Sequence, residues 1–412
     1  MPQPFRAAAL PVAALALVAA TGGPAQAHPA QVRPAYLRGP AGAGECTFPM
    51  KKQIADRPWA LQRLTFDALW AQTRGKGVRV AVIDTGVDRA NPQLTGALDT
   101  GAGRDFLDPK GGDGTNDTVG HGTKVAGLIA ARPQQGTGFV GLAPEATVIP
   151  IRQNDGQGNG NAATLAQAID HAVAKGAQVI NISQDTDAPL TADSELAKAV
   201  QRALDAKAVV IASAGNDGMS GEKRRTYPAA FPGVLAVASS DRNNERAAFS
   251  QPGDFIGIAA PGVDMVSTVP GFGQCIDNGT SFSAPYVAGV AALLRAKHPQ
   301  WTPQEVVWQI QNTAERSVNG RDDYVGWGVV DPVRALTQDR EVPRAPVPDP
   351  GPPPAAAPQA VPLPLTETAQ EHDERVATYA LGITGLLIAV IAATATVVRD
   401  ARRRVGRVGR TD

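Results

Sequence analysis

Four polar residues that stand far apart in the chain, Asp84, His121, Asn216 and Ser281, carry the side chains that acyl transfer requires. A serine hydroxyl becomes a nucleophile when a base removes its proton, and a histidine imidazole takes up a proton near neutral pH. A buried carboxylate holds the imidazole in one tautomer, and an asparagine amide can donate to the oxyanion of the tetrahedral intermediate. We therefore expect Ser281 as nucleophile, His121 as base and Asp84 as its orienting partner. Asn216 and the N–H of Ser281 would form the oxyanion hole.

Each of these residues has an ordinary structural explanation when it is taken alone. An aspartate after a strand often caps a turn or binds a ribose, although no G-x-G-x-x-G follows Asp84. The stretch N-G-T-S-F-S-A-P from Asn278 opens a helix, where Thr280 and the two serines could serve only as caps. Ser283 also stands two residues after Ser281 as a rival nucleophile.

The elements that must position these residues alternate between strand and helix along the chain. Short β-branched runs predict strands at 78–83, 147–151, 178–182, 208–212 and 234–238. Ala-rich amphipathic segments predict helices at 124–130, 165–175 and 196–206, and another helix begins near Ser281. Strands that are apolar on both faces and alternate with helices indicate an α/β fold with a mainly parallel central sheet. Ligands in such folds bind outside the carboxyl ends of the strands, where all four polar residues would lie.

The charge balance argues against nucleic acid as a partner. The chain has 39 basic and 39 acidic side chains, whereas phosphate binding requires a surplus of lysine and arginine. No cofactor or metal is expected. The acidic loop 105–117 contains oxygen ligands that suit calcium, but its spacing matches no EF-hand, and a solvated surface loop is the simpler interpretation.

Both ends of the chain carry segments typical of export and membrane insertion. Arg6 precedes the apolar run 7–20, and Ala25-Gln26-Ala27 fits a signal-peptidase site, so residues 1–27 are predicted to be a signal peptide. Residues 379–398 contain no charge and, at ~1.5 Å per residue, are long enough to cross ~30 Å of hydrocarbon. Six arginines follow in the tail 399–412. The positive-inside rule therefore predicts a single-pass cell-membrane protein with its C-terminus in the cytoplasm and everything before residue 379 outside.

Composition divides the rest of the chain into three parts. Residues 28–57 form an irregular extension, residues 58–337 a globular domain, and residues 338–378 a Pro-rich linker of extended polyproline character. The chain has two cysteines, Cys46 and Cys275, which allow one intramolecular pair. In an exported protein we expect them to form a disulfide, the alternative being two inert buried thiols.

The polar motifs resemble the signature blocks of the subtilisin-like serine proteases. The blocks follow that family's order Asp, His, Asn, Ser and read Ile83-Asp84-Thr85-Gly86, Gly120-His121-Gly122-Thr123, Ala214-Gly215-Asn216 and Gly279-Thr280-Ser281-x-Ser283-Ala284-Pro285. The resemblance implies the three-layer subtilisin fold and serine endopeptidase activity on proteins or peptides. It also makes Ser281 the nucleophile and Ser283 only its neighbour.

A finer resemblance is to the mycosins, the membrane-anchored subtilisin-like proteases of actinobacterial type VII secretion systems. It rests on Arg57-Pro58-Trp59-Ala60-Leu61-Gln62-Arg63-Leu64, the Pro-rich linker and the single C-terminal span. It implies the type VII secretion membrane complex as a partner. The chain would process substrates of that complex and stabilise it, or act mainly as a structural subunit. A cell-surface protease that degrades nutrients is a third possibility.

Two departures from the subtilisin pattern qualify these expectations. The extension 28–57 is too short to fold as an inhibitory pro-domain, so we expect it to wrap the catalytic domain, as mycosin extensions are thought to do. Many subtilisins have a Ser-x-Gly-Gly segment that pairs with the substrate backbone, whereas this chain has Ser183-Gln184-Asp185. We therefore expect a narrow substrate range.

Overall fold

The computed structural model describes residues 46, 48–155, 160–349 and 367–408. The chain divides into two compact units, one up to Pro350 and one from Gly351. The first unit contains all four candidate catalytic residues. The predicted signal peptide, most of the extension and much of the Pro-rich linker lie outside the described residues.

The first unit is built on a seven-stranded sheet in which all neighbouring strands are parallel. Its order is β2-β3-β1-β4-β5-β6-β7. The strands are β1 (Arg79–Asp84), β2 (Arg104–Asp105), β3 (Thr147–Arg152), β4 (Val179–Ile182), β5 (Val209–Ser213), β6 (Leu235–Ser240) and β7 (Ile256–Pro261). The predicted parallel α/β fold is confirmed. Strand β1 lies between β3 and β4, so the strand order changes direction at β1, the kind of position where such sheets bind ligands.

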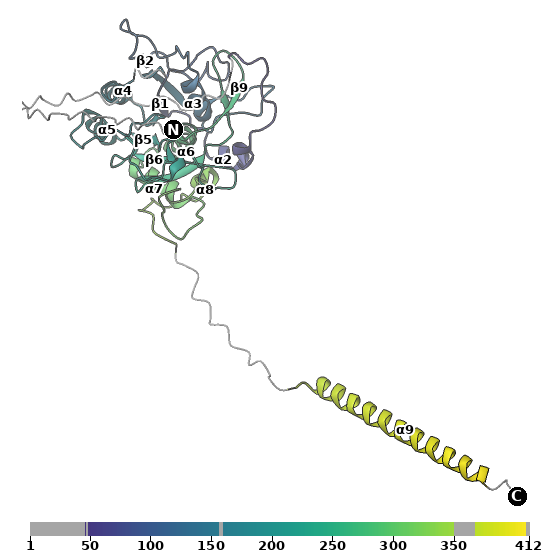
Figure 1. Ribbon diagram of the computed structural model, residues 1–412. Coiled ribbons are helices and arrows are strands. Elements are labelled where there is room, and N and C mark those ends of the chain that lie inside the picture. Colours follow the sequence, from purple (N-terminus) through teal and green to yellow (C-terminus); the bar gives the residue numbers. More distant parts are fainter. Residues whose placement is uncertain (1–45, 47, 156–159, 350–366, 409–412) are drawn as a thin grey trace, which may run out of the picture. The chain divides into compact units, whose positions relative to one another are not determined.

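Helices cover both faces of this sheet, which makes three layers (Figure 1). They are α3 (His121–Ala130) and α6 (Thr280–Lys297) on one face, and α4 (Ala162–Ala174) and α5 (Glu195–Asp205) on the other. Because β1 is pleated, its successive side chains point to opposite faces of the sheet and pack against both helical layers. Val80 and Val82 point into the core beneath α3 and α6, while Ala81 and Ile83 point toward α4 and α5.

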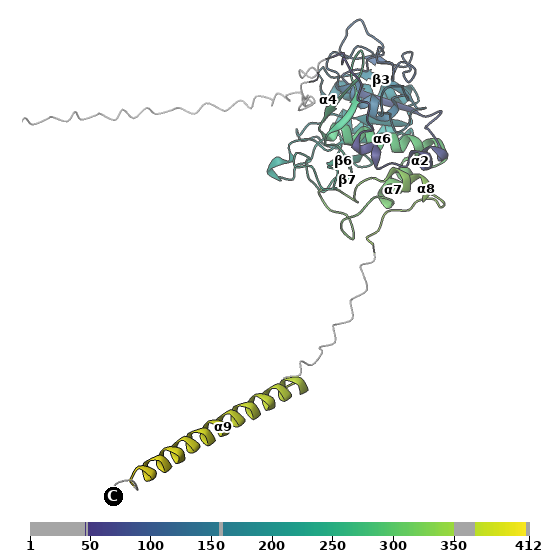
Figure 2. The ribbon, with the colours of Figure 1, turned by 90° about the vertical axis from the view of Figure 1, so that its right-hand side faces the viewer.

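Helix α6 runs through the interior of this unit (Figure 2). Every residue from Thr280 to Arg295 is buried, and the helix contacts strands β4 to β7 as well as α3. A helix that is buried all round needs small and apolar residues on every side, as its Ala-rich sequence provides. The start of α6, where Ser281 lies, is therefore fixed by core packing.

Each predicted strand and helix of this unit is found within about one helical turn of its expected bounds. Helix α3 is an instructive difference, since it begins at His121 and not at Lys124. Gly120 precedes it with φ 83°, a conformation that ends the loop and places His121 in the first helical turn.

Several shorter elements were not predicted. They are the two edge strands of the sheet, β2 and β7, the antiparallel hairpin β8 (Met265–Thr268) and β9 (Gln274–Asp277), the helices α1 (Trp59–Gln62), α2 (Phe66–Gln72), α7 (Pro303–Asn312) and α8 (Pro332–Thr337), and the 3₁₀ turn η1 (Gly218–Ser220). A signal was present for α7, because Thr302 and Glu305 form a capping box around Pro303. The β8–β9 hairpin matters most for function, since β8 packs on α3 and β9 leads directly into α6.

The second unit contains one helix, α9 (Ala369–Val408), of 40 residues. It extends well beyond the predicted span 379–398 at both ends, because charged and polar residues on either side continue the helix. Among the described residues it is the helix that is long and apolar enough to cross a membrane, over 369–404.

Candidate active site

Asp84 and His121 form a buried hydrogen-bonded pair. Asp84 is the last residue of β1 and His121 the first of α3, and their side chains are 3% and 6% exposed. The Nδ1 atom of His121 lies 2.7 Å from Oδ1 of Asp84. An ionised carboxylate only accepts hydrogen bonds, so this contact places the imidazole proton on Nδ1 and leaves the lone pair on Nε2.

A network of hydrogen bonds holds this pair in place. The N–H of Thr85 donates to Asp84 Oδ1 at 2.7 Å, and the Thr85 hydroxyl accepts from the N–H of Gly122 at 2.9 Å. That hydroxyl donates to the carboxylate of Asp117 at 2.8 Å, which also accepts the N–H of Gly120 at 2.7 Å. The first turn of α3 is thereby tied to the end of β1.

Asp117 is therefore not the solvated loop residue that its acidic surroundings suggested. It is 7% exposed and also accepts two hydrogen bonds from Thr123. Burial raises the pKa of its carboxyl, while hydrogen bonds from Thr123, Gly120 and Thr85 act in the opposite direction. Nearby Asp105 pairs with Arg152 at 2.9 Å. Over the described part of the chain, no group of three or more His, Cys, Asp or Glu side chains could hold a metal ion.

Ser281 lies in the first turn of α6 and is 5% exposed. Its hydroxyl donates to the carbonyl oxygen of Ser183 at 3.2 Å, and the Ser183 hydroxyl donates to the carbonyl oxygen of Ser281 at 3.1 Å. The second contact has a cause in the sequence. Pro285 has no N–H, so the carbonyl of Ser281 lacks its usual helical donor four residues later, and Ser183 replaces it.

His121 is adjacent to the start of α6. Its ring centroid lies 5.4 Å from that of Phe282, the residue after Ser281. Nε2 of His121 is buried, and none of the described residues forms a hydrogen bond with it. The Ser281 hydroxyl donates to Ser183 in this structure, so a Ser–His hydrogen bond requires that contact to be replaced. Such bonds often form only when substrate is bound.

Asn216 follows β5 and faces the same helix start. Its Oδ1 atom accepts from the N–H of Thr280 at 2.9 Å and from the Thr280 hydroxyl at 3.0 Å. The expectation that Thr280 could cap the helix was wrong, because Gly279 is the N-cap and no side chain caps it. Thr280 instead fixes the orientation of the Asn216 amide, whose Nδ2 group remains as the end that can donate to an oxyanion.

Ser283 occupies a different environment from Ser281. It is fully buried, and its hydroxyl lies 2.8 Å from the hydroxyl of Ser239 on β6. The two serines therefore point to different parts of the molecule, one to the carboxyl end of β4 and one into the core.

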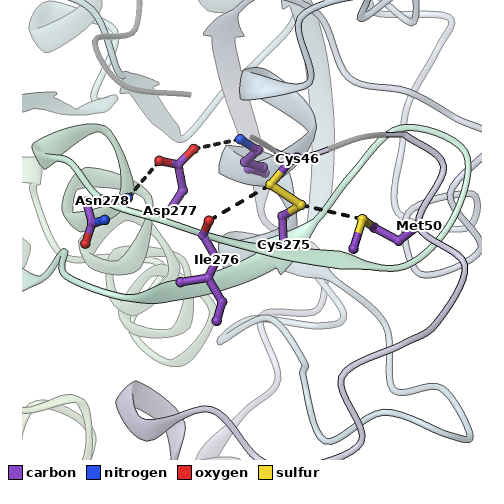
Figure 3. The surroundings of a disulfide bond; sticks show 7 residues. Cys46, Met50, Cys275, Ile276, Asp277 and Asn278 are labelled. Carbon is purple, nitrogen blue, oxygen red and sulfur yellow. Dashed lines mark hydrogen bonds and ion pairs between the residues drawn. A yellow bond between two sulfur atoms is a disulfide. The ribbon is translucent and has the colours of Figure 1, made fainter. Parts of the chain in front are cut away.

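The predicted disulfide between Cys46 and Cys275 is present (Figure 3). It joins the extension to β9, six residues before Ser281. The neighbouring part of the extension runs along the same hairpin, where the N–H of Met50 donates to the carbonyl of Phe272 at 2.8 Å. The ring of Phe48 lies against Gly120 and fills the space that a side chain there would need. The described part of the extension thus contacts the catalytic domain beside His121.

Gln184 and Asp185 continue from β4 beyond Ser183. Gln184 is 4% exposed, and its side chain is hydrogen-bonded to Gln153 at 2.5 Å and to Asn154 at 3.0 Å. The carboxylate of Asp185 lies beside Gly215, where a Cβ atom would be 3.2 Å from its Oδ2. Both side chains therefore border the region between the ends of β4 and β5.

Residues 75–328 match the model of the Peptidase S8 family, which is the subtilase family. Among curated relatives, Mycosin-4 of Mycobacterium tuberculosis is 36% identical over 396 residues, which cover 84% of this chain and 83% of that protein. Subtilisin E of Bacillus subtilis is 36% identical over 283 residues, covering 68% of this chain and 71% of the relative.

Solved structures show the same similarity in three dimensions. MycP1 from Mycobacterium smegmatis superposes with a TM-score of 0.65 at 32% identity. The match covers 78% of this chain and 92% of the MycP1 chain. The MycP3 protease from the type VII (ESX-3) secretion system gives a TM-score of 0.62 at 34% identity. That match covers 70% of this chain and 92% of the MycP3 chain.

Proposed function

Because this chain belongs to the subtilase family of serine endopeptidases, we propose that it cleaves peptide bonds through an acyl-enzyme formed on Ser281. The observation that supports this proposal most directly is the pairing of His121 with Asp84 at 2.7 Å. That contact leaves Nε2 of His121 beside the start of α6 with its lone pair available.

The proposed reaction has two halves. Nε2 of His121 takes the hydroxyl proton of Ser281 as its Oγ attacks the carbonyl carbon of the substrate, and Asp84 stabilises the imidazolium. His121 then gives that proton to the leaving amine as the C–N bond breaks. In the second half, Nε2 of His121 takes a proton from water as the water oxygen attacks the acyl-enzyme ester. His121 gives that proton to Oγ of Ser281 as the ester C–O bond breaks, which releases the second product and restores the Ser281 hydroxyl.

The oxyanion of each tetrahedral intermediate would be stabilised by two donors. These are Nδ2 of Asn216, oriented by Thr280, and the N–H of Ser281, which lies in the first turn of α6. The N–H groups of a first helical turn have no partner within the helix, and the helix dipole adds positive potential there. Both donors are fixed before the reaction, so they need no reorganisation as charge develops.

The test is labelling of the full-length protein in detergent with a fluorophosphonate, which reacts with an activated serine. We expect the wild type and Ser283→Ala to be labelled and Ser281→Ala to remain unlabelled. Ser283→Ala is a matched control, because it removes a buried hydroxyl two residues away on the same helix. Labelling of Ser281→Ala, or no labelling of the wild type, would contradict the proposed mechanism.

We further propose that the protein is anchored in the cell membrane by α9 and works with a type VII secretion membrane complex. The similarity to MycP1 and MycP3, both from type VII secretion systems, supports this over at least 70% of the chain. In this proposal the catalytic unit lies outside the cytoplasm and the Arg-rich tail inside, since arginines concentrate after the apolar part of α9.

Membership of such a complex allows a mainly structural role with dispensable proteolysis. A strain that lacks the gene and expresses Ser281→Ala separates the two roles. If the protein acts as a protease in secretion, substrate processing stops in this strain. If secretion of every substrate also remains intact, proteolysis and the structural role are separable.

The side chains of Gln184 and Asp185 support a narrow substrate range, since they stand where many subtilisins have glycines. The alternative, a surface protease that degrades nutrients, predicts free digestion of casein by the full-length protein in detergent. We expect casein to be resistant under conditions in which Ser281 is labelled.

A further inference from the structure

A buried ion pair lies close to the candidate catalytic residues, and the proposed mechanism does not use it. Nζ of Lys124 is 2.7 Å from Oδ2 of Asp277, and both side chains are 3% exposed. Lys124 lies on α3, three residues after His121, and Asp277 ends β9, four residues before Ser281. The pair therefore connects the helix that carries the base to the strand that leads to the nucleophile.

Stability alone does not explain this pair. Two charges lose their hydration when they are buried, and an apolar pair of similar volume often stabilises a fold equally well. An ion pair differs from an apolar pair in being directional, because its strength depends on the distance and orientation of the two groups. This property suits a contact that fixes the relative position of two elements.

The surroundings of the pair link it to both reacting side chains. Phe282 follows Ser281, and its ring centroid lies 5.4 Å from that of His121 and 5.9 Å from Nζ of Lys124. The aromatic ring thus contacts the imidazole and faces the ammonium group at the same time. A displacement of Lys124 would move α3 relative to this ring.

Asp277 is held at its other oxygen as well. Its Oδ1 atom accepts the N–H of Asn278 at 2.8 Å, and the residue stands two positions after Cys275 of the disulfide (Figure 3). The side chain of Asn278 in turn accepts the N–H of Asp264 at 2.8 Å. One carboxylate therefore connects Lys124 to the turn from which α6 begins.

The same hairpin contacts the backbone of α3. The hydroxyls of Ser267 and Thr268 on β8 donate to the carbonyls of Lys124 and Thr123 at 2.5 and 2.8 Å. At Gly127 the approach is so close that a Cβ atom would lie 2.2 Å from the Thr268 hydroxyl. Helix and hairpin are in close contact, and the ion pair lies where that contact meets the start of α6.

From these contacts we infer that Lys124 and Asp277 are positioning residues that set the distance between the imidazole of His121 and the hydroxyl of Ser281. The inference rests on the proposed function, since it concerns the rate at which Ser281 reacts. Loss of the pair should slow the chemical step, because a displacement of about 1 Å can lower a rate about 100-fold. Binding of a small probe should change little.

The experiment measures the saturation kinetics of fluorophosphonate labelling on the full-length protein in detergent, which separates the rate constant kinact from the binding constant KI. Lys124→Met is compared with Lys297→Met. Lys297 lies at the far end of α6 and pairs with the buried Asp339 at 2.7 Å, so this control also removes a lysine from an ion pair. We expect kinact to fall about 10- to 100-fold in Lys124→Met only, with KI unchanged in both variants.

A second variant keeps the test decisive if Lys124→Met folds poorly. Lys124→Met/Asp277→Leu replaces the pair by apolar groups, and we expect it to keep the wild-type thermal unfolding midpoint but to show the same loss of kinact. Wild-type kinact in this variant, or an equal loss in Lys297→Met, would overturn the positioning role while leaving the proposed function intact. An unlabelled wild type would overturn both.

Discussion

At the scale of single residues, Thr280 fixes the orientation of the Asn216 amide, the proposed oxyanion donor. An asparagine side chain presents an acceptor at one end and a donor at the other, and only the donor can stabilise an oxyanion. Two hydrogen bonds from Thr280 occupy the acceptor, at 2.9 Å from its N–H and 3.0 Å from its hydroxyl. The proposed catalytic role of Asn216 therefore depends on a neighbour that does not itself need to touch the substrate.

Substitution of Asn216 by alanine should lower kcat by about 10²–10³, the range found when an oxyanion-hole donor of subtilisin is removed. KM should remain near its wild-type value, because the lost interaction forms mainly in the transition state. Steady-state hydrolysis of a peptide substrate measures both constants. A rise in KM with unchanged kcat would contradict the proposed role of Asn216.

Thr280→Val should lower kcat about fivefold, since it removes one orienting hydrogen bond of about 1 kcal/mol and keeps the side-chain shape. Thr280→Ser retains the hydroxyl and is the matched control, with kcat expected close to that of the wild type. A loss of kcat in Thr280→Ser with wild-type kcat in Thr280→Val would show that the methyl group of Thr280, and not its hydroxyl, is what matters.

At this scale the sequence predicts residue types better than contacts. Asp84, His121, Asn216 and Ser281 stand in recognisable blocks next to strand and helix ends, and the structure brings them to one edge of the sheet. The role of Asp117 was missed, because a carboxylate in an acidic, Gly-rich loop looks solvated until the loop is seen to fold beneath the first turn of α3. Contacts of this kind depend on the conformation of a loop, and the spacing of residue types along the sequence does not reveal that conformation.

At the scale of elements, helix α6 contains a proline, and one carbonyl of the helix therefore takes its hydrogen bond from a side chain just beyond β4. The carbonyl of Ser281 would normally accept the N–H of residue 285, and Pro285 cannot donate. The hydroxyl of Ser183, just beyond β4, supplies the missing donor at 3.1 Å. The start of α6 is thereby attached to the end of β4 at the position of the proposed nucleophile.

A double-mutant cycle tests this attachment. Ser183→Ala should lower the free energy of unfolding by about 1–3 kcal/mol, because it leaves a buried carbonyl without a donor. The same substitution should be less destabilising in a Pro285→Ala background, where residue 285 regains its N–H. Urea unfolding followed by tryptophan fluorescence reports on the catalytic unit alone, since all five tryptophans lie between residues 59 and 327. Equal effects of Ser183→Ala in both backgrounds would contradict the assignment.

The disulfide makes a separate prediction for the hairpin β8–β9 and the extension. Cys46 and Cys275 are 229 residues apart, so loss of the bond should destabilise the catalytic unit by up to about 5 kcal/mol in the chain-entropy model. Unfolding of Cys46→Ser/Cys275→Ser is compared with that of the wild type, with and without a reductant. The reductant should destabilise the wild type and leave the double variant unchanged. Identical unfolding of the oxidised wild type and the variant would contradict this expectation.

Elements whose apolar residues recur in a clear pattern along the sequence were predictable, and elements that depend on tertiary contacts were not. The β-branched runs of the parallel sheet and the Ala-rich helices α4 and α5 carry clear patterns. The hairpin β8–β9 is two strands of four residues each, and polar residues such as Ser267, Thr268 and Gln274 interrupt any apolar run there. It exists because it packs on α3 and is joined to Cys46. The ion pair of Lys124 and Asp277 could not be predicted from the sequence either, since the two residues are 153 positions apart.

At the scale of the whole molecule, two compact units serve different purposes. The first contains the sheet and the candidate active site, and the second contains α9, which by length and composition could cross a membrane. Deletion of residues 367–412 should therefore release the protein from membranes. In sodium carbonate extraction we expect the full chain in the membrane pellet and the shortened chain in the supernatant. Retention of the shortened chain in the pellet would place the membrane contact elsewhere.

The proposed orientation is tested by labelling introduced cysteines in intact cells with a membrane-impermeant maleimide. Met219→Cys, at a position where the side chain is 74% exposed in the catalytic unit, should be labelled. Thr411→Cys in the Arg-rich tail should react only after the cells are permeabilised. The opposite pattern would show that the catalytic unit faces the cytoplasm.

The central claim is that Ser281 is the nucleophile, and the most direct measurement locates the fluorophosphonate adduct by peptide mapping and fragmentation mass spectrometry. Because Ser281 and Ser283 lie in one short stretch of α6, fragmentation between them assigns the added mass to one serine. We predict that the entire adduct is found on Ser281. An adduct on Ser283, or on any residue outside the start of α6, would contradict the proposed active site.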